Sequence, residues 1–139
     1  MSIENIILAE DRRGISALRP YLPHNFCEKA ASFVLDNPGT ILIVTGFYIL
    51  SAKAVETDGP PGAIAIGNAL QTLGYKVIYV TDLHAKFILE QAVGKSARVV
   101  SFPITNSSIS RQFAQDLLKE LKPSIVIGIE RCGFTKDGF

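Results

Sequence analysis

Four short apolar runs, rich in β-branched residues, constrain the fold of this chain more than any other feature. They cover residues 40–45, 75–80, 97–102 and 124–129. A continuous apolar run bounded by turn signals is typical of a strand that is buried on both faces, as in a parallel sheet. Segments with the apolar spacing of helices separate the runs, so we expect right-handed β-α-β crossovers.

The segments between these runs predict three helices, over residues 59–73, 84–93 and 107–121. Residues 46–58 carry no periodic pattern and are expected to form a loop. Ahead of the first strand, Pro20 and Pro23 interrupt a helical pattern, so we expect one helix before them and another over residues 25–35. The sequence therefore predicts a Rossmann-like three-layer α/β sandwich with a mostly parallel sheet. An N-terminal helical segment, residues 1–37, is expected to pack on that sheet.

Length and composition fit a single globular domain that spans residues 1–139. Hydrophobic residues make up 47% of the chain and charged residues 19%, which is the opposite of a disordered composition. The net charge is +1, and no basic stripe indicates a nucleic-acid partner. The longest apolar run, residues 41–50, is too short to span a membrane. A homo-oligomer remains open.

The cysteines and the two ends of the chain bear on its compartment and its completeness. Cys27 and Cys132 form no CxxC pair, and no signal peptide is apparent, so we expect a reducing, cytoplasmic location. The chain ends at Phe139, soon after the fourth expected strand. An α/β sheet usually continues with another helix, so the sequence leaves open that the chain is a fragment.

Polar residues follow the expected strands at their carboxyl ends. Ligands bind beyond this edge in open parallel sheets, and the segments that end there lie far apart in the sequence. The edge is expected to gather four carboxylates, one arginine and two small residues, namely Glu56, Asp58, Asp82, Glu130, Arg131, Thr45 and Gly46. These residues together predict a polar ligand site.

The segment ETDGPPG at residues 56–62 allows two interpretations. Asp58 or Thr57 can cap a helix that starts near Gly59, and the free amides there would attract an anion. Gly59 and Gly62 would let a ligand approach the backbone closely. The alternative is an ordinary capped helix with a proline start. The segment matches neither a Walker A loop nor GxGxxG.

The remaining polar residues also have a structural alternative. Asp82 can cap the next helix, and Glu130 with Arg131 can form a salt bridge at the end of the sheet instead of binding a ligand. The histidines and cysteines lack the spacing of a zinc site. A hard cation such as Mg²⁺ or Mn²⁺, held by several of the carboxylates, remains possible because it needs only a few oxygen ligands.

Several motifs, taken together in chain order, are similar to those of one family. They are TGF at residues 45–47, ETDGPPGA at 56–63, TD at 81–82, IERCG at 129–133 and KDG at 136–138. Over residues 40–138 the chain resembles the D-glutamate cyclase-like C-terminal domain. The resemblance implies a lyase of amino-acid metabolism that cyclises D-glutamate to 5-oxo-D-proline with loss of water.

Two hypotheses follow for the function. The first is an enzyme acting on D-glutamate or a related small acidic amino acid, with a Mn²⁺ or Mg²⁺ ion activating the departing oxygen. The base would be one of Glu56, Asp58, Asp82 and Glu130. The substrate would be held by Thr45, Gly46, Thr57, Gly59, Gly62 and Arg131. The second is a non-catalytic module that binds a small anion or a nucleotide.

Overall fold

The computed structural model of the chain describes residues 2–131. These residues fall into two compact units, Met1–Pro38 and Gly39–Phe139. The motif residues 132–138, with Cys132 among them, lie outside the described part of the chain.

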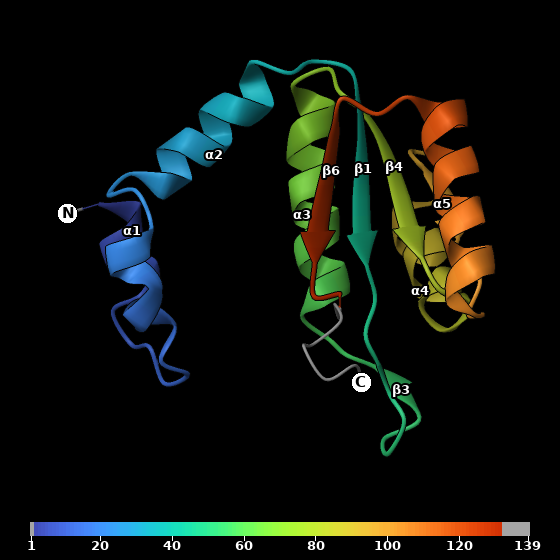
Figure 1. The fold of residues 1–139 in the computed structure, drawn as a ribbon, viewed down its shortest axis with the longest axis horizontal. Coiled ribbons are helices and arrows are strands. Elements are labelled where there is room, and N and C mark those ends of the chain that lie inside the picture. The colour runs from blue at the N-terminus through green and yellow to red at the C-terminus, as the bar shows by residue number, and fades with distance from the viewer. Residues whose placement is uncertain (1, 132–139) are drawn as a thin grey trace. The chain divides into compact units, whose positions relative to one another are not determined.

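The second unit is built on a four-stranded parallel sheet (Figure 1). Its strands are β1 (Thr40–Thr45), β4 (Lys76–Thr81), β5 (Arg98–Ser101) and β6 (Ile125–Ile129), in the spatial order β5-β4-β1-β6. They are connected by α3 (Gly59–Thr72), α4 (Leu83–Val93) and α5 (Ser107–Leu121). Helices α3 and α4 cover one face and α5 the other, so the predicted Rossmann-like three-layer α/β fold is confirmed.

The core of this unit lies on both faces of the two central strands. On the face covered by α5, Leu42, Ile78 and Val80 are at most 2% exposed and pack with Leu117 of the helix. On the other face, the ring of Tyr79 lies against α3 at Gly67, where any Cβ would overlap the tyrosine hydroxyl. Burial on both faces explains why these strands are continuous apolar runs.

A short antiparallel hairpin occupies part of the segment that the sequence predicted to be a loop. It consists of β2 (Tyr48–Ile49) and β3 (Ala54–Val55). Strands of two residues are too short to produce an alternating pattern, which is why the sequence did not indicate them. The hairpin leads directly into Glu56, whose N–H donates to the carbonyl of Phe47 at 2.8 Å. The first acidic residue of the predicted site is therefore held by this hairpin.

The first unit is helical throughout, but not as one helix ahead of Pro20. It contains α1 (Ile3–Ile7), the 3₁₀ helix η1 (Ile15–Tyr21) and α2 (Phe26–Leu35). The carboxylate of Asp11 breaks the expected first helix, because it accepts hydrogen bonds from the backbone N–H groups of Ser16 and Arg13. These bonds, the one from Ser16 above all, lower the pKa of Asp11 to about 2. The second expected helix is confirmed as α2.

Glu4 supplies a capping interaction to α2 from another helix. The nominal cap residue, Asn25, makes no side-chain capping bond, whereas Oε1 of Glu4 accepts from the Cys27 N–H at 3.0 Å. Glu4 is only 3% exposed. Hydrogen bonds from its own backbone N–H and from that of Cys27 hold the pKa of Glu4 below its usual range. This carboxylate therefore joins α1 to α2 in its ionised form.

Replacing Glu4→Gln should loosen the start of α2, because the amide is a weaker acceptor than the carboxylate. Hydrogen exchange of the Cys27 amide should accelerate in the variant. In the wild type, the same exchange should be slow at neutral pH. Its protection factor, which removes the pH dependence of intrinsic exchange, should fall as the pH falls through the lowered pKa of Glu4, since a depressed carboxyl pKa stabilises the fold only while the group is ionised. The exposed Glu10→Gln is the matched control, and equal exchange in both variants would contradict the capping role.

Candidate functional site

The predicted site lies at the topological switch point of the sheet. From β1 the chain moves to β4 and β5 on one side, whereas β6 pairs with the opposite side of β1. A crevice at the carboxyl ends of the strands, where the strand order reverses, is the usual ligand position in such sheets. Here Gly46 follows β1, Glu130 follows β6, and α3 begins at Gly59.

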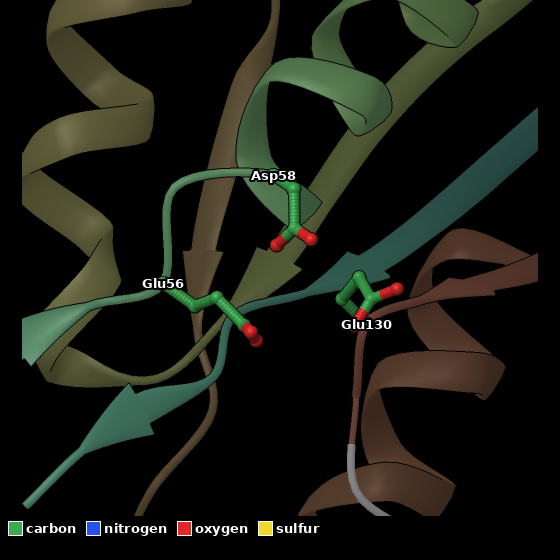
Figure 2. A group of neighbouring side chains, drawn as sticks. All are labelled: Glu56, Asp58 and Glu130. Atoms are coloured by element: carbon green, nitrogen blue, oxygen red, sulfur yellow. The ribbon is translucent and has the colours of Figure 1, made fainter. Parts of the chain in front are cut away.

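Three carboxylates converge at this point, two from the short segment between β3 and α3 and one from the end of β6. Glu56 follows β3, Asp58 is the N-cap of α3, and Glu130 follows β6. Ligand oxygens of all three lie within 4.8 Å of one another. Figure 2 shows the three side chains reaching toward a common space. Glu56 is half-buried and the other two are exposed, so the group faces solvent and can receive a ligand. We call these three residues the acidic cluster.

Backbone features at two positions bring Glu130 into the acidic cluster. Glu130 adopts a left-handed conformation with φ +47°, which costs a non-glycine residue about 1 kcal/mol or more. The start of α3 lies directly against it, since a Cβ at Gly59 would come within 2.7 Å of the Glu130 Cβ. Gly59 is thus required for the close approach of the helix to Glu130.

Two buried threonine hydroxyls lie beneath the edge. Thr45 is 0% exposed and Thr81 1% exposed, and neither Oγ1 has a hydrogen-bond partner among the described residues. The Thr45 hydroxyl lies beside Gly59, at 3.3 Å from the position a Cβ would take there. Buried polar atoms normally have a partner, either from the protein or from ordered water or a bound ligand. Thr45 therefore adds an unsatisfied oxygen next to the acidic cluster.

Asp82 and Arg131 form an ion pair beside the acidic cluster. Oδ1 of Asp82 caps α4 by accepting from the N–H groups of His84 at 2.9 Å and Ala85 at 3.3 Å. Its Oδ2 accepts from Nη1 of Arg131 at 2.6 Å, and the same nitrogen donates to the Gly46 carbonyl at 2.7 Å. We call this arrangement the Arg131 clamp. Asp82 is only 4% exposed and lies outside the acidic cluster.

The clamp also decides the ionisation of Asp82. Burial alone would raise its pKa, but the hydrogen bonds from Arg131, Ala85 and His84, with the charge of Arg131, together lower it below the usual range. Asp82 therefore stays ionised, with both oxygens occupied by internal partners.

The first turn of α3 offers few donors to an anion. The Gly59 N–H donates to Oδ1 of Asp58, and the Gly62 N–H donates to the Asp58 carbonyl. Pro60 and Pro61 have no N–H. The sequence suggested that free amides at this turn attract an anion, and the structure removes that argument. With three carboxylates above the turn, the local charge favours a cation instead.

Two cavities border Arg131. One of about 290 Å³ is lined by Phe47, Gly128, Glu130 and Arg131. The other, of about 150 Å³, is lined by Val44, Val80, Thr81, Phe102 and Arg131. The larger volume is at the lower end of ligand pockets and suits a molecule the size of a small amino acid.

The structure places the other predicted binding residues around these features. Gly46 has φ +117° and lies under the clamp, while Thr57 is exposed between two members of the acidic cluster. Gly62 has open space where a Cβ would lie.

Sequence reasoning did not identify Tyr48, whose ring stacks on His84 with centroids 4.1 Å apart and joins the hairpin to the start of α4. No signal in the sequence links two residues so far apart.

Comparison with known proteins identifies the family of this chain. The family model described as "D-glutamate cyclase-like, C-terminal" matches residues 3–139. The chain belongs to this family. The match begins well before residue 40, where the motif resemblance started, so the N-terminal helices are part of the family region. The chain is also 36% identical over 122 residues to the human protein named "D-glutamate cyclase, mitochondrial". That similarity covers 78% of this chain and 20% of the human protein.

Two glycines of the site should respond in opposite ways to alanine. At Gly46 a Cβ would lie 2.5 Å from the Thr81 hydroxyl, at a φ that alanine rarely adopts. Gly46→Ala should therefore lower the free energy of unfolding by about 1–3 kcal/mol or more. Gly62→Ala, with nothing within 4 Å, should leave stability unchanged or raise it by up to about 1 kcal/mol. Denaturant unfolding measures both, and equal destabilisation would contradict the tight fit at Gly46.

Proposed function

We propose that the chain carries the site of a D-glutamate cyclase-like lyase, which converts D-glutamate, or a related small acidic amino acid, to its cyclic lactam and water. One observation carries the proposal: Glu130 converges with Glu56 and Asp58, which lie more than 70 positions away in the sequence, and it lines a cavity together with Arg131. Family membership and the name of the human relative support the choice of reaction. Because the chain spans a fifth of that relative, the activity remains a proposal for this chain.

The acidic cluster fits a divalent cation of the Mg²⁺ or Mn²⁺ type. Such ions prefer carboxylate oxygens at about 2.1 Å, so their ligand oxygens lie about 3–4 Å apart. The oxygens of Glu56, Asp58 and Glu130, within 4.8 Å of one another, need only small side-chain movements to reach that spacing. A bound ion would supply Lewis-acid polarisation of the carboxyl group that loses its oxygen.

The reaction forms one bond and breaks another within a single small molecule. The amine nitrogen attacks the side-chain carboxyl carbon, a C–N bond forms, a C–O bond breaks, and one oxygen leaves as water. No oxidant or second substrate is needed. Holding the amine and the carboxyl group in contact supplies much of the acceleration, because a folded substrate conformation replaces many extended ones.

Glu130 and Arg131 are assigned the principal roles toward the substrate, because both line the 290 Å³ cavity. One oxygen of Glu130 is assigned to the cation and the other to the substrate amine as the base. The clamp uses only Nη1 of Arg131, and the side chain is 35% exposed. Its Nε and Nη2 are assigned to hold a substrate carboxylate. Asp82 is not assigned the role of base, since both of its oxygens already accept hydrogen bonds.

A cytoplasmic location is likewise proposed for the activity. It is supported by the cysteine pattern of the sequence. Within residues 2–131, the structure contains no helix with the length and apolar character needed to cross a membrane. The human relative is named as mitochondrial, so fractionation of cells that produce this chain is the direct measurement.

The reaction is tested by incubating the full chain with D-glutamate and Mn²⁺ and following 5-oxoproline. Turnover is expected, and Glu130→Gln should reduce it by about 100-fold or more because the base is lost. Asp116→Asn, an exposed carboxylate on α5 bonded to Gln112, is the charge-matched control and should retain full activity. Equal rates in the wild type and in Glu130→Gln would refute the assignment.

The cation is tested separately by titrating Mn²⁺ in the absence of substrate. Glu56→Gln and Asp58→Asn should each weaken Mn²⁺ binding by about tenfold or more, since each removes one anionic ligand. Asp116→Asn should bind as the wild type does. Electron paramagnetic resonance of the free ion gives the affinities, and a wild type that binds no Mn²⁺ at millimolar concentration would exclude the cation site.

A further inference from the structure

We infer that the Arg131 clamp, formed by Arg131, Asp82 and the Gly46 carbonyl, holds Glu130 in the acidic cluster. The clamp thereby sets the affinity of the acidic cluster for a cation. Toward the cation, Arg131 and Asp82 are then positioning residues, because neither belongs to the cluster itself. The inference rests on the proposed function, in that it assigns a consequence to the same cluster. It adds a mechanism by which residues outside the cluster control it.

The geometry of the clamp makes it a rigid anchor. One nitrogen, Nη1 of Arg131, donates both to the Asp82 carboxylate and to the Gly46 carbonyl. Asp82 is fixed in turn by the two N–H groups at the start of α4. The clamp therefore joins the segments after β1, β4 and β6 through charge-assisted hydrogen bonds, which are stronger than neutral ones.

Glu130 depends on such an anchor because its backbone is in an unfavourable conformation. A non-glycine residue at φ +47° persists only where the surrounding structure over-determines it. On one side, the stem of Glu130 is packed against Gly59 at the start of α3. On the other side, the next residue in the chain is Arg131, which the clamp fixes. Without the clamp, the contact with Gly59 is what remains, within residues 2–131, to oppose relaxation of Glu130 away from the cluster.

Charge alone predicts a different outcome, which makes the inference testable. Arg131 is a cation close to the proposed ion, so removing it would strengthen ion binding if its effect were electrostatic only. Removing Asp82 as well leaves the net charge unchanged, and the through-space effects largely cancel. The clamp, in contrast, is lost in both cases. Positioning and electrostatics therefore predict opposite results for the single variant and different results for the double variant.

The decisive variant is the double substitution Asp82→Asn with Arg131→Gln. Asparagine keeps an oxygen that can cap α4, and no buried carboxylate is left without its partner. Mn²⁺ affinity, measured without substrate, should fall by about tenfold or more, the usual effect of losing a group that orients a metal ligand. Unchanged affinity in the double variant, or tighter binding in Arg131→Gln alone, would overturn the inference.

A matched control removes another ion pair between an arginine and a carboxylate. Arg98 and Glu120 pair at 2.8 Å on the surface of the same unit, with more than half of each side chain exposed. The double variant Arg98→Gln with Glu120→Gln should bind Mn²⁺ as the wild type does. A similar loss in this control would assign the effect to general destabilisation and overturn the positioning role.

A second measurement separates this inference from the proposed function. In a crystal structure of the Asp82→Asn, Arg131→Gln variant without metal, Glu130 should leave the left-handed conformation and its carboxylate should move away from Glu56 and Asp58. An unmoved Glu130 would overturn the clamp, whatever the wild type binds. A wild type that binds no Mn²⁺ while Glu130 moves in the variant would refute the cation site and leave the clamp established as a structural anchor.

Discussion

The parallel pairing of β1 with a neighbour on each side is the constraint on which the rest of the structure depends. Because Val44 pairs with Val80 on one side and with Gly128 on the other, the three strands end at the same level. The residues that follow them then meet, although they lie up to 85 positions apart in the sequence. A slip of one residue in β6 would exchange its two faces and remove Glu130 from the acidic cluster.

The local chemistry of this edge selects the charge of its ligand. Helix starts usually attract anions, through free N–H groups and the positive end of the helix dipole. At the start of α3 this capacity is already used, because Asp58 accepts from Gly59 and two prolines supply no donor. The dipole instead stabilises the carboxylates that lie near it. Concentrating three negative charges within 4.8 Å is costly without a counter-ion, and a divalent cation would offset that repulsion.

Most of the fold followed from the sequence, whereas the site followed only in part. Buried strands and crossover helices leave periodic patterns, so their positions were predicted to within one or two residues. The convergence at the carboxyl edge followed from parallel topology, which brought Glu56, Asp58 and Glu130 into one prediction. The roles of Asp82 and Arg131 could not be separated in this way. For each residue, a structural role and a role toward a ligand were both chemically reasonable. Only the distance between the two side chains shows that they form an ion pair.

Several departures from regular geometry lie at the site. Gly46 at φ +117° and Glu130 at φ +47° flank the clamp, and the unpartnered hydroxyls of Thr45 and Thr81 lie beneath it. The left-handed backbone of Glu130 and the two unpartnered hydroxyls each cost free energy, and a fold selected for stability alone would remove them by simple substitutions. The arrangement makes physical sense if the strained backbone and the unsatisfied oxygens serve a bound ligand. On that argument we propose the edge of β1 and β6 as the functional centre of the domain, with the well-packed strands behind it providing the stability that such a site requires.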